Sequence, residues 1–162
     1  MTTHRALKAL VAATLLASTL GPAVAADTQN LNVTASVQGV CRFSSTVQTL
    51  SFGTLNPATD GATTAGTGAA VKYKCTKGTA AAGVTADTGL HVSGGTRRMQ
   101  HATVVADFIP YTLTITQGTQ TGLGFGSGND LSLGVAGAVA LTDYANVTAG
   151  NYSDTVILSI TP

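Results

Sequence analysis

The residues of this chain that could take part in chemistry are few and scattered. Beyond residue 26 the sequence contains two cysteines, two histidines and seven aspartates, with no glutamate and no tryptophan. His91 and His101 are ten residues apart and have no cysteine or carboxylate motif beside them, so we do not expect a metal site. Nothing selects two of the aspartates as the acid and base of a glycosidase. The sequence therefore predicts neither an enzyme nor a bound cofactor.

The N-terminal residues are typical of a secretory signal peptide. Arg5 and Lys8 precede an apolar run, and Ala23-Val24-Ala25 is a small-x-small cleavage signature. The apolar run is shorter than the roughly 20 residues that a helix needs to cross a bilayer, so no membrane insertion is expected. We expect a cleaved signal peptide at residues 1–26, an N-terminal extension at residues 27–38 and one domain at residues 39–162.

The two cysteines are expected to form a disulfide. A secreted chain with an even number of cysteines contains disulfides more often than free thiols, so Cys41 should pair with Cys75. A redox pair would need close Cys-x-x-Cys spacing, which this sequence lacks.

The exported part of the chain carries little charge. Without Arg5 and Lys8, six basic residues remain against the seven aspartates. Nucleic acids and anionic membranes bind basic patches, so neither is an expected partner. A surface rich in threonine, serine, asparagine and glutamine has weak electrostatic protection against self-association.

Short alternating segments between glycine, proline and asparagine breaks predict an all-β protein. An immunoglobulin-like sandwich is the first choice and a small barrel the second. Val71, Tyr73 and Cys75 alternate with two lysines, the pattern of a strand with one buried face. Loops are expected at residues 56–68 and 118–129. The expected strands are residues 31–37, 47–55, 71–75, 83–92, 99–105, 109–116, 131–135, 138–141 and 152–162.

Apolar and polar residues alternate at both ends of the exported chain. Residues 31–37, hereafter the alternating segment, are apolar at every odd position, and the last strand places Val156, Leu158 and Ile160 on one face with no later strand to cover it. An uncovered terminal strand is a template for pairing, and an extended segment can fill the groove beside it by β-strand addition. The residues leave two interpretations open: exchange of this segment between chains, and an ordinary first strand of the same domain.

Several motifs follow one another along the exported chain. The alternating segment leads to Cys41, a glycine-rich stretch occupies residues 122–128, and three longer motifs are Ser51-Phe52-Gly53-Thr54-Leu55-Asn56-Pro57, Ile109-Pro110-Tyr111-Thr112-Leu113 and Gly150-Asn151-Tyr152-Ser153-Asp154-Thr155-Val156. In this order they resemble the spore coat protein U family, which includes the pilin subunits of archaic chaperone–usher pili.

The resemblance implies an incomplete immunoglobulin-like pilin of about six to seven strands, completed by strand donation between subunits. A periplasmic chaperone would lend it a strand, and an outer-membrane usher would join identical or related subunits into a fimbrium at the cell surface, with a role in adhesion and biofilm formation. Carried over to this sequence, the donor residues are Leu31, Val33, Ala35 and Val37, and the acceptor groove includes Tyr152, Val156, Leu158 and Ile160.

Two other functions stay open at this point. A secreted spore-coat or matrix protein could use the same strand exchange without a pilus, and a self-complete sandwich could bind carbohydrate. Neighbouring genes for a chaperone and an usher would separate the pilus from the coat. Size in solution would separate strand exchange from a self-complete monomer.

Overall fold

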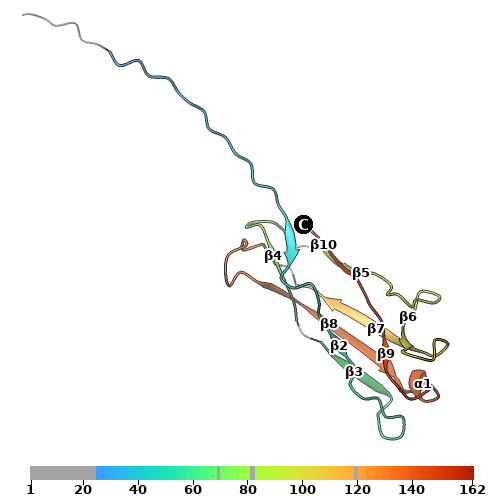
Figure 1. Ribbon diagram of the computed structural model, residues 1–162. Helices are drawn as coiled ribbons and strands as arrows, with labels where there is room; N and C mark the ends of the chain where they lie inside the picture. The colour runs from blue at the N-terminus through green and yellow to red at the C-terminus, as the bar shows by residue number, and fades with distance from the viewer. Residues whose placement is uncertain (1–24, 69, 81–82, 119) are drawn as a thin grey trace, which may run out of the picture. The chain divides into compact units, whose positions relative to one another are not determined.

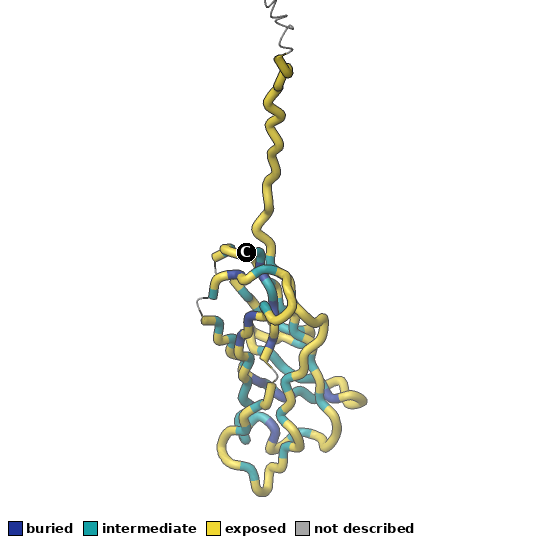
Figure 2. Tube along the Cα trace, turned by 90° about the vertical axis from the view of Figure 1, so that its left-hand side faces the viewer, coloured by how far each residue is buried: buried dark blue, intermediate teal, exposed yellow. Residues whose placement is uncertain are grey.

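The computed structural model describes residues 25–68, 70–80, 83–118 and 120–162 (Figure 1). The chain divides into two units at residues 35 and 36. The described part of the first unit, residues 25–35, has no helix or strand and is exposed throughout. Among the described residues, every strand and every buried residue belongs to the second unit, residues 36–162 (Figure 2).

The second unit is almost entirely β-structure, as the sequence predicts. Its elements are β1 (Cys41–Phe43), β2 (Leu50–Ser51), β3 (Thr63–Gly68), β4 (Val71–Cys75), β5 (Gly83–Ala86), β6 (Arg97–His101), β7 (Phe108–Thr116), β8 (Leu131–Ala140), α1 (Leu141–Tyr144), β9 (Tyr152–Ser153) and β10 (Leu158–Thr161).

One antiparallel sheet forms the larger layer, with the strand order β1-β4-β8-β7-β6-β9. β8 is the central strand: residues 131–133 pair with β4, residues 137–140 pair with β3, and β7 follows its other edge. β2 extends this sheet through β3. β10 pairs only with β5 among the described strands, and the side chains of Leu158 and Ile160 pack against the larger sheet. The immunoglobulin-like sandwich is confirmed.

Alternation explains which faces are buried. In β4, Val71, Tyr73 and Cys75 are buried while Lys72 is exposed, as the pattern of the sequence predicts. They form one core cluster with Leu131 and Leu133. A second cluster contains the buried side chains of Ile109, Tyr111, Val139 and Tyr144.

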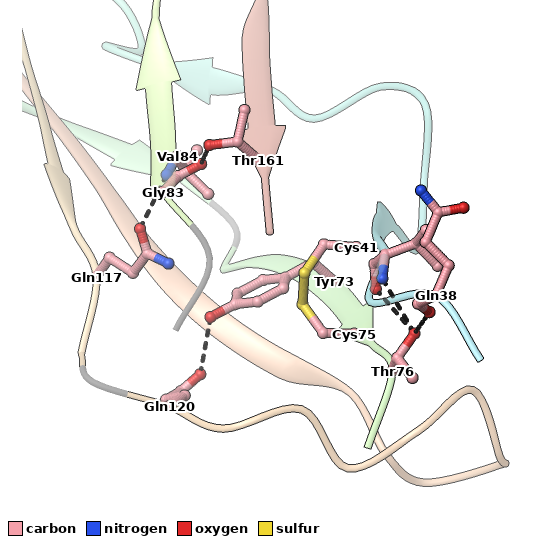
Figure 3. The surroundings of a disulfide bond; sticks show 11 residues. Gln38, Cys41, Tyr73, Cys75, Thr76, Gly83, Val84, Gln117, Gln120 and Thr161 are labelled. Atoms are coloured by element: carbon pink, nitrogen blue, oxygen red, sulfur yellow. Dashed lines mark hydrogen bonds between the residues drawn. A yellow bond between two sulfur atoms is a disulfide. The ribbon is translucent and has the colours of Figure 1, made fainter. Parts of the chain in front are cut away.

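The predicted disulfide joins the first two elements of the larger sheet and is confirmed (Figure 3). Cys41 lies directly opposite Cys75, with their Cα atoms 4.1 Å apart. The Thr76 amide donates to the Val40 carbonyl, which makes the cysteines a non-hydrogen-bonded pair, the closer of the two antiparallel arrangements. Cys75 is 1% exposed, so the bond is part of the core.

Several sequence-based boundaries are wrong. Residues 63–68 form β3 within a predicted loop, and residues 131–140 form one strand where two were predicted. The expected strand 152–162 is divided into β9 and β10, and α1 adds one turn of helix that was not predicted. No strand is assigned to residues 31–37 in the single chain. The predicted signal peptide falls largely on residues outside the described ranges.

Candidate functional site

A groove of about 760 Å³ opens in the side of the folded unit. Residues 48–55 form one bank and residues 147–158 form the other. The inner face of the larger sheet forms the floor, through Val71, Met99, Ile109, Tyr111, Leu113 and Val135. The floor of the groove is therefore apolar, while its banks also carry polar side chains, and the groove contacts both core clusters.

The 48–55 bank rests on glycines. Leu50 and Phe52 lie over Gly66 of β3 and Gly137 of β8. A Cβ at residue 137 would lie 2.7 Å from Leu50 Cδ2 and 2.8 Å from the Thr112 carbonyl oxygen, so no larger residue fits there. Only Leu50 and Ser51 pair with a neighbouring strand, β3. The bank is held by side-chain packing more than by a continuous ladder.

The 147–158 bank continues into β10, whose outer edge is open. The Asp87 amide donates to the Ile157 carbonyl, and the Leu90 amide donates to the Thr155 carbonyl. Because amide and carbonyl groups alternate between the two edges of an antiparallel strand, those of Val156, Leu158 and Ile160 point away from β5. No described strand pairs with that edge. The last strand of the chain thus presents unpaired backbone groups beside an apolar groove.

His101 and Asp107 hold the start of this bank in place. The buried His101 ring accepts bonds at Nδ1 from the amides of Thr103 and Val104, and Nε2 lies 3.3 Å from the Ala149 carbonyl oxygen. The Thr148 amide donates to Asp107 Oδ2 at 3.0 Å, and hydrogen bonds from Thr148 hold the pKa of Asp107 below its usual value. These contacts serve a structural purpose: they fix the chain just before Tyr152.

Tyr111 connects the floor of the groove to the 147–158 bank. Its hydroxyl donates to Asp154 Oδ2 at 2.7 Å, and Asp154 Oδ1 accepts from the Leu90 amide. This pulls Asp154 toward the sheet and interrupts the strand between β9 and β10. Burial of the phenol, followed by the bond to Asp154, raises the pKa of Tyr111 above its usual value.

Replacing Tyr111 by phenylalanine should change the alkaline stability of the domain. A raised pKa in the folded state stabilises the fold below about pH 10, where the unfolded tyrosine is also protonated, and this contribution is lost as the pH rises toward the folded pKa. We expect Tyr111→Phe to lower the free energy of unfolding at pH 7 by about 1.5–3 kcal/mol, since a bond to a charged group is lost. Urea unfolding between pH 8 and 11 should show a weaker alkaline decline for the variant. An identical decline in both proteins would contradict this role of Tyr111.

The structure brings together three of the four residues predicted for the groove. Tyr152, Val156 and Leu158 line it, whereas Ile160 packs against the cluster around Tyr73 and is not part of the lining. The sequence-based prediction missed the whole 48–55 bank. The feature of the sequence that could have indicated this bank is the pair Leu50 and Phe52, which share one face of a short strand.

The alternating segment contains no helix or strand in the single chain. Leu31 is 87% exposed, and Val33 and Val37 are each 84% exposed. Ala35 is also exposed. Leu31, Val33 and Val37 are thus large apolar side chains that are exposed in the single chain.

The described residues contain no group of three or more histidine, cysteine, aspartate or glutamate residues placed to hold a metal ion. Every buried side-chain nitrogen or oxygen among them has a hydrogen-bond partner. Within the same residues, no helix has the length and apolar character needed to span a membrane.

Comparison with known proteins places the chain in a family. No curated protein matches it. The family model of the Spore Coat Protein U domain matches residues 27–159, which is most of the sequence. This is a family of structural coat and pilin-like proteins of the cell exterior, and not an enzyme family. The chain therefore belongs to the Spore Coat Protein U domain family.

Proposed function

We propose that this protein is the structural subunit of an extracellular fibre, an archaic chaperone–usher pilus, and that it polymerises by strand exchange. The alternating segment of one copy enters the groove of the next, with Leu31, Val33, Ala35 and Val37 facing the floor. The observation that carries the proposal is the open edge of β10 beside an apolar groove. Such an edge pairs readily with an added strand.

The dimensions of the segment and the groove agree. At about 3.3 Å per residue, seven extended residues span about 23 Å, and the eight residues of the 48–55 bank span at most about 26 Å. The apolar side chains at alternate positions would all face one way, and a slip of one residue would turn them all outward. The segment therefore has both the length and the pattern to occupy the groove in a single register.

A signal peptide at residues 1–26 would direct the chain to the periplasm, where a chaperone would supply a temporary strand to the groove. An outer-membrane usher would then exchange that strand for the segment of another subunit, and the fibre would serve surface adhesion and biofilm formation. A coat or matrix protein that exchanges strands without a pilus is the second candidate, because the same open edge supports it.

The test compares the mature protein, residues 27–162, with two variants. One lacks residues 27–38, and the matched control keeps the composition of these residues in a shuffled order without alternation. We expect the mature protein to form fibres by electron microscopy and large species by sedimentation, and both variants to form neither. A synthetic peptide of residues 27–38 should raise the melting temperature of the deletion variant. A monomeric mature protein whose melting temperature survives the deletion unchanged would exclude strand exchange.

A further inference from the structure

Thr76 fastens the chain immediately after the alternating segment. Its hydroxyl donates to the Gln38 carbonyl at 3.0 Å and accepts from the Val40 amide at 3.1 Å (Figure 3). Its own amide donates to the Val40 carbonyl at 2.9 Å. One threonine therefore binds both ends of the three-residue stretch 38–40, hereafter the junction.

The junction is also anchored on both sides of Thr76. Cys41 follows Val40 and is bound to Cys75, the residue before Thr76. The turn after Thr76 is supported by Gly122, which accepts from the Gly78 amide and donates to the Thr79 carbonyl. Gly39 packs close to Thr79, where an added Cβ would lie 3.3 Å from Thr79 Oγ1. The junction is thus part of the domain and not a free linker.

We propose that Thr76 is a positioning residue that fixes the point and direction in which a subunit presents its alternating segment to a second copy. This inference rests on the proposed function. Val37, the last apolar residue of the segment, is followed directly by Gln38, so no free residue separates the exchanged strand from the clamped chain. Two joined subunits would then be connected by a stiff joint whose angle Thr76 maintains.

Substitutions that remove or keep the Thr76 hydroxyl test the proposal. Thr76→Val keeps the shape and removes the hydroxyl, which abolishes its side-chain bonds to the Gln38 carbonyl and to the amide and carbonyl of Val40. Thr76→Ser keeps the hydroxyl and should restore them. Thr79→Val is the matched control, because Thr79 is on the same turn and its hydroxyl has no hydrogen bond to the junction.

The first measurement is amide hydrogen exchange of Val40 in the mature protein, with the groove filled by added peptide 27–38. We expect exchange about tenfold faster in Thr76→Val, which is the effect of losing one hydrogen bond of typical strength. Thr76→Ser and Thr79→Val should match the wild type. If the Val40 amide exchanges equally fast in Thr76→Val and in the wild type, and the two proteins also have equal unfolding free energies, Thr76 does not hold the junction in place.

The second measurement is the bending of fibres in electron micrographs. Thr76→Val fibres should contain as many subunits as wild-type fibres but have a shorter persistence length and a broader spread of angles between neighbours, while Thr76→Ser fibres should bend like the wild type. Equal persistence lengths in Thr76→Val and wild type would overturn the positioning role. Wild-type protein that forms no fibre would instead overturn the proposed function, and with it the role of Thr76 between copies, whatever the exchange rate of Val40.

Discussion

Replacing Val33 and Val37 together by aspartate is expected to abolish the proposed fibre formation while a subunit held by the proposed chaperone remains soluble. Both valines are 84% exposed in the single chain, so the new charges should not disturb the folded unit. In the groove they would face the apolar floor formed by residues such as Ile109 and Leu113. An unpaired charge in an apolar site costs far more than the burial of a valine contributes.

Thr34→Asp with Ser36→Asp is the matched control for this experiment. It adds the same two charges to the same segment, but on the face that would point to solvent in the exchanged strand. Electron microscopy and sedimentation should find fibres for the control and none for the valine variant, and circular dichroism should find the same fold in both. Fibres of normal length from the valine variant would contradict the proposed role of the alternating segment.

Loss of the disulfide is expected to have the largest effect on stability. Cys41 and Cys75 close a loop with a sequence separation of 34, and in the chain-entropy model such a crosslink stabilises the folded state by about 3–4 kcal/mol. That is a large share of the roughly 5–15 kcal/mol that separates folded from unfolded domains. The Cys41→Ser variant should therefore give less stable subunit and a lower denaturant midpoint.

Treatment with a reductant controls for the substitution itself. Dithiothreitol should lower the unfolding midpoint of the wild type toward that of Cys41→Ser and leave the variant unchanged. Equal unfolding free energies of the oxidised wild type and the variant would show that the crosslink does not stabilise the fold.

The strands that the sequence predicts best are those in which large apolar and polar side chains alternate within the strand itself. Val71, Tyr73 and Cys75 alternate with lysines, and their burial follows from that alternation alone. β3 shows the opposite case. Its sequence, Thr-Thr-Ala-Gly-Thr-Gly, has no large apolar residue, and it becomes a strand through pairing with β8 and β2. The sequence of β3 itself contains no sign of this pairing with other segments, so from its sequence it resembles a loop.

Glycine also accounts for the single long strand β8. It continues through residues 136 and 137, where the sequence predicts a break, and Gly134 lies within the predicted strand 131–135. Gly134 is on the exposed face, and Gly137 is required because Leu50 and Phe52 lie against it. Contacts between distant parts of the chain thus override the local preference of glycine for turns.

The sequence predicts only one bank of the candidate site, because the other bank also depends on contacts between distant parts of the chain. The apolar residues of β10 and of the alternating segment each form a regular pattern, so the sequence alone indicates a strand at both ends of the chain. The 48–55 bank depends on the glycines of β3 and β8, which no local pattern connects to Leu50 and Phe52. The division between β9 and β10 depends in the same way on Tyr111, which is distant in sequence from its partner Asp154.

The two edges of β10 differ, since β5 occupies one and the other is open. Under the proposed exchange each subunit has one segment to give and one edge to receive, and these surfaces are unlike. Repeated contacts between unlike surfaces produce open filaments when each copy gives its segment to a new neighbour, and closed rings, of which a reciprocally exchanged dimer is the smallest, when the chain of contacts returns to the first copy. The filament would be unbranched, because β5 blocks the second edge. It would also have a direction, with an unfilled groove at one end and an unused segment at the other, so its two ends would differ in stability and in the partners that can cap them.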